Sequence, residues 1–469
     1  MPPRSSPPPS PPEAWKPLLH LTHRIRRPLE RFLHIEAASG IILLVATAVA
    51  LVWVNSPWSR SYFGFWHAPI GIRLGPFEFE HSLEWFVNDG LMAVFFFVAG
   101  MEIRREIHQG ELSEWRRAAL PIAAALGGMV APAALYLILA NDPATRNGWG
   151  VSMATDIAFA VGVLTLLGKR VPAALRVLLL ALAVIDDLGA ILVIALFYSP
   201  RVSLPGLWIA AGGIAGIFLM QALGVRRKLA YVLPATVAWA GVYKAGIHPT
   251  VAGVLVGFMT PVRAWFGPEG FLHIVQRQLD RLSPRVRAPS LDSHDLAGTL
   301  RNVSEARREA LSPAESLIET LHPWVAFGIM PVFALANAGV SLRGVTLEGP
   351  SVRVAAGVAI GLLVGKPLGI LLVSALALRL GLARLPAGLG ARHLLVLGLV
   401  AGIGFTMALF IARLAFAETP TLVAARLGVL GGSAAAMLLA LLCGRLLLAP
   451  GDRGDVAQTA DEAENSTEL

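Results

Sequence analysis

The stretch at 176–197 reads RVLLLALAVIDDLGAILVIALF, and it decides how the rest of the chain is interpreted. It is long enough to cross the hydrocarbon core of a bilayer, which needs roughly 20 apolar residues in a helix. Beyond Arg176 its only charges are Asp186 and Asp187, near the middle. Ionised groups at that depth are costly, so they are functional-site hypotheses by default. The stretch therefore predicts a membrane-spanning helix that carries a functional pair of carboxylates.

The composition extends this interpretation to the whole chain. Of its 469 residues, 55% are hydrophobic and only 15% are charged, and the mean hydropathy is +0.64. Soluble domains carry about 25% charged residues. The single Cys443 excludes a disulfide framework and a cysteine-built metal site. We therefore expect an all-α polytopic membrane protein.

Twelve apolar segments have about the length of a membrane span. The seventh and eighth are short, and we separate them at Gly246 and Pro249. The expected segments are 34–54, 82–101, 118–140, 148–168, 173–198, 203–223, 229–243, 247–262, 322–341, 352–378, 393–416 and 424–448.

Polar stretches divide these segments into two blocks. The insert between the blocks is a cytoplasmic linker or a regulatory module, and its sequence leaves both open. The expected organisation is a disordered proline-rich tail at 1–33, segments one to eight at 34–262 with a small external hairpin near 60–80, the cytoplasmic insert at 263–321, segments nine to twelve at 322–448, and an acidic cytoplasmic tail at 449–469.

Basic residues set the expected orientation. They are about three times as numerous on the side that carries both termini as on the opposite side, and cytoplasmic loops carry the excess of Lys and Arg. Both termini are therefore expected in the cytoplasm. The formal charge of +8 then reflects topology, and we expect no nucleic-acid partner.

Four ionisable residues are expected together near mid-membrane. Asp156 and Asp187 lie at similar distances, about 20–25 Å of helix, on either side of the loop that joins segments four and five. Asp186 adjoins Asp187, and Lys366 is the midpoint of segment ten. Three acids and one base at one depth predict a cluster.

The two adjacent acids cannot share one target, because neighbouring residues on a helix point about 100° apart. One can face a cavity and bind a cation while the other meets Lys366, the only buried base. The alternative is a static network of neutralising salt bridges. It explains one pair at most, and the excess acids must then be protonated or bound to a cation.

The expected ligands are hard oxygen atoms, which favour Na⁺, Li⁺ or protons over zinc or copper. Thr155 precedes Asp156 and offers a hydroxyl or carbonyl ligand. The alternative for its hydroxyl is a hydrogen bond back to its own helix.

Seven motifs closely resemble those of the NhaA-type bacterial sodium/proton antiporters, in order, from about residue 34 to 447. They are VNDGLMAVFF at 87–96, ATDIAFA at 154–160, IDDLGAI at 185–191, HPWVA at 322–326, ANAGV at 336–340, GKPLG at 365–369 and GIGFTM at 402–407.

The resemblance implies a fold with about twelve transmembrane helices, in which segments 3–5 and 10–12 are inverted-topology repeats. NhaA is itself a standard example of such repeats, so this architecture follows from the resemblance alone. Segments four and eleven would be discontinuous and would cross at mid-membrane. For Gly402 and Gly404 the alternative is close helix packing without a break.

The resemblance also implies the roles of the buried charges. Asp187 would be the principal carboxylate for Na⁺ or Li⁺, with Asp156 and Thr155 close by as further metal ligands. Asp186 would pair with Lys366. In the family, the aspartate offsets the positive ends of the broken helices and the lysine the negative ends. The implied activity is electrogenic, pH-regulated exchange of cytoplasmic Na⁺ or Li⁺ for external protons.

The resemblance to the family is less complete at the residues that the family uses for pH regulation. Glu102, Arg105 and Glu106 match a charged cluster at the cytoplasmic mouth, and His248 and His322 match histidines linked to the pH response. The family usually has Glu-His-x-x-His, whereas this chain has IETLH at 318–322, so its activation pH is expected to differ. Packing or helix capping is the alternative role for each histidine.

The remaining expectations concern partners and location. We expect a bacterial inner-membrane transporter that is not an enzyme, surrounded by lipid, with no cofactor besides the transported ions and no organic substrate. The resemblance implies a homodimer through the external hairpin. The alternatives are a sodium-coupled symporter of an organic anion and a non-transporting membrane scaffold. The first would need a roomier second pocket with polar anchors, and three uncompensated mid-span acids fit the second poorly.

Overall fold

The structure is a computed structural model. It describes residues 36–74, 77–199, 202–264, 267–286, 310–342, 348–416 and 420–448, with isolated positions between 298 and 303. The expected tails at 1–33 and 449–469, and much of the insert at 263–321, lie outside the described residues.

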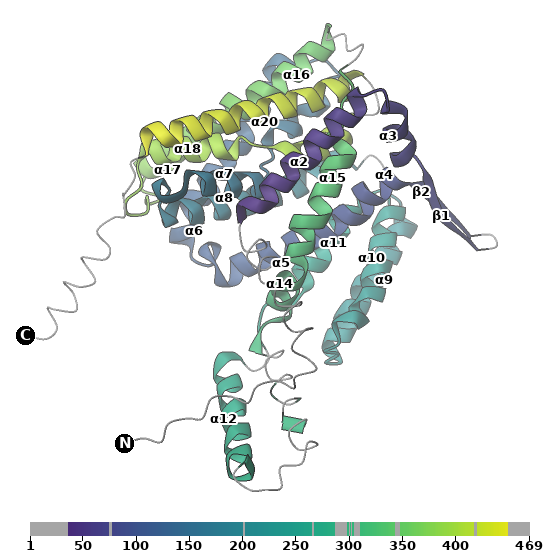
Figure 1. Ribbon diagram of the computed structural model, residues 1–469, viewed down its shortest axis with the longest axis vertical. Coiled ribbons are helices and arrows are strands. Elements are labelled where there is room, and N and C mark those ends of the chain that lie inside the picture. The colour runs from purple at the N-terminus through teal and green to yellow at the C-terminus, as the bar shows by residue number, and fades with distance from the viewer. Residues whose placement is uncertain are drawn as a thin grey trace, which may run out of the picture.

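The described residues form a bundle of helices with one two-stranded sheet at its edge (Figure 1). Several helices are continued by a π-helical or 3₁₀ turn. In chain order the main elements are α2 (Glu36–Asn55), α3 (Ser59–Trp66), β1 (Pro69–Leu74), β2 (Phe77–Ser82), α4 (Leu83–Trp85), a π turn (Phe86–Leu91), α5 (Met92–Gln109), α6 (Trp115–Leu139), a 3₁₀ segment (Arg146–Met153), α7 (Ile157–Leu167), α8 (Ala173–Phe197), α9 (Leu204–Ala222), α10 (Val232–Lys244), α11 (Pro249–Met259), α12 (Gly267–Val286), α14 (Pro313–Trp324), a π turn (Val325–Ile329), α15 (Met330–Asn337), α16 (Pro350–Ile360), a π turn (Gly361–Gly365), α17 (Lys366–Arg379), α18 (Ala391–Ala401), α19 (Phe405–Ala415) and α20 (Pro420–Leu447).

Nine helical stretches among the described residues are long and apolar enough to cross a membrane, and the bent pair α18–α19 makes a tenth. The prediction of a helical polytopic membrane protein is therefore confirmed. Helices also form at the seventh and eighth expected segments. However, α10 has 13 residues and α11 only 11, which is less than a full span. The number of twelve crossings stays a prediction.

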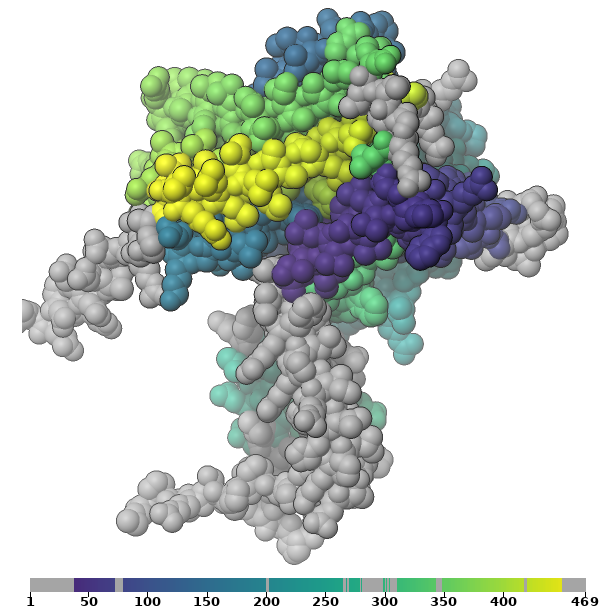
Figure 2. Space-filling model, turned by 45° about the horizontal axis from the view of Figure 1, so that its top comes forward, coloured from purple at the N-terminus to yellow at the C-terminus, as the bar shows by residue number. Residues whose placement is uncertain are grey.

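The outer surface of the bundle is apolar, as contact with lipid requires. Large hydrophobic side chains on separate helices are exposed, among them Val52 on α2, Ile138 on α6, Trp208 on α9 and Leu446 on α20. Soluble monomers rarely expose apolar surface on this scale. Figure 2 shows α20 as a long rod along one face of the bundle, where it packs on α16, α18 and α7.

The ninth expected segment begins earlier than its hydropathy suggests. We expected it from 322, but α14 begins at Pro313. Ser312 caps the helix through the backbone N–H of Glu315, and the Glu315 side chain accepts from the backbone N–H of Ser312. This capping box, with proline at the first helical position, is a strong start signal in a polar sequence. The insert therefore ends before Pro313 and not at 321. It also contains α12, which lies apart from the bundle (Figure 1).

The expected hairpin is formed by β1 and β2, which pair antiparallel from Pro69 opposite Ser82 to Leu74 opposite Phe77. It projects from the bundle beside α3 and α4 (Figure 1). We call the end of the bundle that carries α3 and this hairpin the hairpin end.

Two glycines allow α6 and α17 to cross at close range. A Cβ added to Gly127 would lie 2.1 Å from the carbonyl oxygen of Gly369, and a Cβ added to Gly369 would lie 2.0 Å from that of Gly127. Small residues at such crossings are the usual way in which membrane helices approach one another. The crossing matters for function because α17 begins with Lys366.

Gly127→Ala and Gly369→Ala should each destabilise the protein, because the new methyl group meets backbone that cannot move aside. Overpacking of this kind costs about 1–3 kcal/mol. The control is Gly431→Ala on α20, where the added Cβ meets nothing within 4 Å. It should be neutral or slightly stabilising, because alanine favours a helix by about 1 kcal/mol over glycine. Thermal unfolding midpoints of the purified proteins in detergent measure these effects, and equal midpoints for all three variants would contradict the close crossing.

Candidate ion-binding site

Two interrupted helices meet in the interior of the bundle. The 3₁₀ segment ends at Met153, the backbone is extended at Ala154 and Asp156, and α7 then begins. In the other segment, α18 and α19 are separated by 402–404 and bent by 50°. The Asp156 backbone N–H donates to the carbonyl oxygen of Ile403 at 2.7 Å, so one interruption contacts the other directly.

The Asp156 carboxylate accepts hydrogen bonds from the N-termini of the two helices that follow the interruptions, α7 and α19. Its Oδ1 accepts from the backbone N–H of Phe159 at 3.1 Å, in the first turn of α7. Its Oδ2 accepts from the backbone N–H of Thr406 at 3.1 Å, in the first turn of α19, and from the Thr406 hydroxyl. Helix N-termini carry partial positive charge and attract anions. One fully buried carboxylate therefore compensates two helix ends.

The C-terminal ends of the 3₁₀ segment and of α18, which precede the interruptions, each contact a hydrogen-bond donor. Lys366 donates to the carbonyl oxygen of Met153, where the 3₁₀ segment ends. The Thr155 hydroxyl lies 2.9 Å from the carbonyl oxygen of Ala401, where α18 ends. These carbonyl ends carry partial negative charge, so a cation and a hydroxyl donor suit them. A π turn at Gly361–Gly365 immediately precedes Lys366, and such turns are frequent at functional sites.

Lys366 and Asp186 form a fully buried ion pair, with Nζ 2.8 Å from Oδ2. The Thr155 hydroxyl also contacts this oxygen at 2.7 Å. Its contacts are thus to Asp186 and Ala401 and not to its own helix. The other oxygen of Asp186, Oδ1, is buried, and no donor from the described residues reaches it.

Asp187 differs from its neighbours because, within the described part of the chain, no hydrogen bond or salt bridge reaches its carboxylate. It is 4% exposed, whereas Asp156 and Lys366 are 0% exposed. It interacts electrostatically with four charged residues, Asp186, Glu102, Asp156 and Lys366. A buried carboxylate that lacks a partner is free to take up a proton or a small cation.

The predicted cation ligands are brought together but are not equally available. The oxygens of Asp156 are engaged with Phe159 and Thr406, and the Thr155 hydroxyl is engaged with Asp186 and Ala401. No group of three His, Cys, Asp or Glu side chains in the described ranges is arranged to hold a metal ion. A cation at Asp187 would therefore have to compete with Thr406 for the oxygens of Asp156.

The residues expected to regulate pH response fall into two places. Glu102 on α5 interacts electrostatically with Arg105 and with His322, which is exposed on α14. Glu106, on the same helix, accepts a hydrogen bond from the backbone N–H of Glu111 at 2.7 Å.

His248 lies elsewhere, at the start of α11. Its Nδ1 lies 2.8 Å from the Thr250 hydroxyl, and its Nε2 lies 3.4 Å from Asp89. The structure therefore does not place His248 with the cluster around Glu102.

Sequence reasoning missed three groups that hold the site together. Thr406 binds Asp156, the Ser433 hydroxyl accepts from the backbone N–H of Phe405 at 3.1 Å, and the carbonyl oxygen of Met153 accepts from Lys366. A weak signal existed for Thr406, which follows the glycines in GIGFTM and is the one hydroxyl residue in the expected segment 393–416. Ser433 and Met153 gave none, because their roles depend on which segments pack together.

The comparisons with known proteins agree with one another. The family model for Na⁺/H⁺ antiporter 1 matches residues 30–443. The Na⁺/H⁺ antiporter NhaA 2 of Myxococcus xanthus is 67% identical over 459 residues, covering 98% of this chain and 97% of that protein. The NhaA 2 protein of Sorangium cellulosum is 56% identical, with 98% of each chain covered. The Na⁺/H⁺ antiporter NhaA of Bordetella petrii is 50% identical over 93% of this chain and 95% of its own length.

Thr406→Val should destabilise the protein, because it keeps the shape of the side chain but removes the hydroxyl that donates to Asp156. Loss of a buried hydrogen bond to a charged group costs about 1.5–3 kcal/mol. Thr406→Ser is the matched control, since it retains the hydroxyl and should stay close to the parent protein. The measurement is the thermal unfolding midpoint in detergent. A serine variant as unstable as the valine variant would assign the effect to packing of the methyl group instead.

Proposed function

This chain belongs to the NhaA family of Na⁺/H⁺ antiporters, and from that premise we propose that it exchanges cytoplasmic Na⁺ or Li⁺ for external protons across the bacterial inner membrane. The observation that carries the proposal is the Asp187 carboxylate. It is buried among other charges, and no hydrogen bond from the described residues reaches it. Such a group has two stable states, protonated or bound to a cation, and an antiporter needs that alternation.

The fold proposed with this function has twelve crossings, with segments 3–5 and 10–12 as inverted repeats. The contact between the two interruptions, through Asp156 and Ile403, supports crossing of the two discontinuous segments. Alternating access would expose this point to one side of the membrane at a time. Both termini would be cytoplasmic, as the distribution of basic residues favours.

Coupling would arise from competition at one site. A proton and a cation cannot both occupy the Asp187 carboxylate, so binding of one releases the other. Asp156 and Thr155 lie close by as further oxygen ligands, and a cation would draw on them when their present hydrogen bonds break.

Electrogenic exchange requires that more protons than cations move in each cycle. Lys366 is the second group that can carry a proton, because its charge depends on the pair with Asp186. We infer that entry of a cation at Asp187 loosens this pair and lets Lys366 release its proton. The alternative, a pair that never opens, would make Lys366 a static clamp.

Regulation and partners complete the proposal. The cluster of Glu102, Arg105 and His322 would respond to cytoplasmic pH, with Glu106 beside it, and His248 would act at a separate place. The protein would sit in lipid as a homodimer joined through its hairpin. It would use no cofactor, bind no nucleic acid or organic substrate, and carry out no enzymatic reaction.

Asp187→Asn should abolish Na⁺/H⁺ exchange and Na⁺ binding while the protein still folds. The amide cannot exchange a proton for a cation. Flux of ²²Na⁺ and protons in proteoliposomes measures the first effect and calorimetry the second, and current across the same membranes tests electrogenicity in the parent protein. Asp156→Asn should be milder and raise the KM for Na⁺ more than it lowers the maximal rate.

The matched control for these changes is Asp142→Asn, at an exposed carboxylate that pairs with Arg353. It should leave both flux and Na⁺ binding unchanged. Near-normal Na⁺ affinity in the Asp187 variant would mean that the cation binds elsewhere.

The apparent KM for Na⁺ should fall as pH rises. Protons compete with Na⁺ for one carboxylate, so the competitor becomes scarcer, and the KM levels off once the carboxylate has lost its proton. Flux assays over about pH 6 to 9, a range in which buried ionisable groups are known to titrate, give this curve. A KM that stays constant across the range would indicate separate proton and cation sites.

A further inference from the structure

One face of α19 runs from the ion-binding site to the hairpin end. Thr406, Phe410 and Arg413 are spaced by four and three residues, so they share a side of the helix. Thr406 contacts Asp156, and Arg413 lies about two turns further on, roughly 10 Å along the axis. Because α19 is one continuous helix, a shift at Thr406 also moves Arg413.

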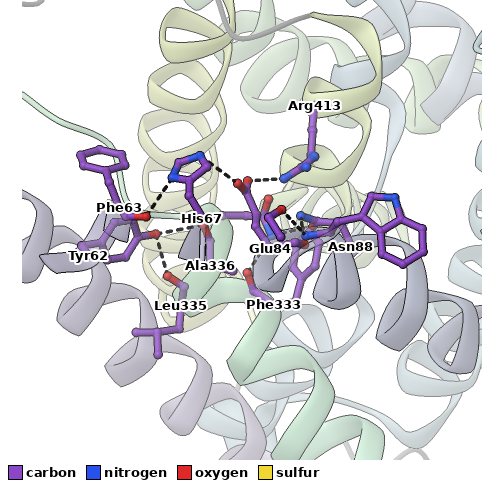
Figure 3. Close-up of polar contacts among 12 residues, drawn as sticks. Tyr62, Phe63, His67, Glu84, Asn88, Phe333, Leu335, Ala336 and Arg413 are labelled. Carbon is purple, nitrogen blue, oxygen red and sulfur yellow. Dashed lines mark hydrogen bonds and ion pairs between the residues drawn. The ribbon is translucent and has the colours of Figure 1, made fainter. Parts of the chain in front are cut away.

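The hairpin end of this face makes an ion pair. Arg413 donates to Oε1 of Glu84 on α4, and the two side chains are 26% and 10% exposed. The other oxygen, Oε2, lies 3.6 Å from Nε2 of His67, whose Nδ1 lies 2.9 Å from the carbonyl oxygen of Phe63. Figure 3 shows Glu84 between Arg413 and His67. Salt bridges on open surfaces contribute little, but a largely buried Glu84 depends on its partner.

The elements around Glu84, the partner of Arg413, are hydrogen-bonded to one another. Asn88 donates to the carbonyl oxygen of Glu84 at 2.8 Å and accepts from Asn337 on α15 at 2.8 Å. The Tyr62 hydroxyl of α3 reaches the carbonyl oxygens of Leu335 and Ala336 at 2.8 and 2.9 Å (Figure 3). We call these elements, α3, α4 with its π turn, and α15, the frame.

Between the ion-binding site and the ion pair, the face of α19 is covered by aromatic side chains. Phe410 packs against Phe333 of α15, Phe96 of α5 and the ring of His248. Phe410, Phe333 and Phe96 are each 0% exposed. An ion therefore cannot pass from Asp156 toward the hairpin end along this face while α19 stays against the frame.

We propose that Arg413 and Glu84 are positioning residues for transport, and that their ion pair holds α19 against the frame while the site is closed toward the hairpin end. Opening toward that end separates α19 from the frame and breaks the pair. The inference rests on the proposed function, because it assigns the pair to one half of the alternating-access cycle. Neutralising the pair therefore shifts the population toward the state that is open at the hairpin end.

The test uses the full-length protein in proteoliposomes of known orientation, with the KM for Na⁺ measured from each side. Glu84→Gln with Arg413→Gln removes both charges and leaves neither side chain as an unpaired ion. The KM should rise about threefold or more on the side opposite the hairpin and fall on the hairpin side, because apparent affinity scales with the population of the competent state. A pair that only stabilises the fold would not move the two values in opposite directions.

Two further variants sharpen the result. Glu84→Arg with Arg413→Glu restores the attraction within the pair but places a carboxylate near Asp89, which interacts with Arg413 in the parent, so it should return both KM values part of the way toward those of the parent. Arg353→Gln with Asp142→Asn deletes a more exposed ion pair that contains no residue of α19 or of the frame, and it should leave both values unchanged.

The outcomes separate this inference from the function on which it rests. Opposite KM shifts in the neutral double variant, absent from the Arg353 control, support the positioning role. Unchanged values, or values that move together, overturn it while exchange by the parent protein continues. Absence of exchange in the parent itself would overturn the proposed function instead.

Discussion

The structure depends on one constraint, which is that every charge and every helix end placed inside a membrane protein must be compensated there, because no bulk water reaches it. Two helices are interrupted in the interior, and this creates four uncompensated ends. Asp156 meets both N-termini through the backbone N–H groups of Phe159 and Thr406. Lys366 and Thr155 meet the carbonyl ends at Met153 and Ala401. The breaks and the charges therefore require one another.

This compensation explains why the site contains more acid than base. The Asp156 carboxylate is hydrogen-bonded to the helix N-termini, and the Asp186 carboxylate contacts Lys366 and Thr155. Only Asp187 remains without a hydrogen bond from the described residues, and it lies beside the others. Under the proposed function, a small cation or a proton would complete the balance of charge at this position. Exchange of one for the other is the chemistry that a family of Na⁺/H⁺ antiporters needs.

Much of this protein could be predicted from its sequence. The apolar stretches predict spans because a hydrogen-bonded helix tolerates the hydrocarbon core. Apart from the end of α5 at Gln109 and the start of α14 at Pro313, their bounds agree with the helices to within a few residues. The cost of burying ions is sufficient to single out Asp156, Asp186, Asp187 and Lys366 from the sequence. The hairpin followed from its turn residues. The start of α14 was also readable, since Ser312 and Glu315 form a capping box, but hydropathy alone placed it nine residues too late.

Partner choice was decided only by the tertiary structure. Adjacent residues on a helix point in different directions, so the sequence required Asp186 and Asp187 to have different roles. The tertiary structure, in which α6 packs against both α8 and α17, determined that Asp186 meets Lys366. Thr406 and Asp156 are 250 residues apart and meet because two interruptions coincide in space. The same holds for Arg413 and Glu84, whose charges lie near the ends of two separate spans. Local rules determine where a helix runs and which residues are costly to bury, whereas long-range packing determines which group relieves that cost.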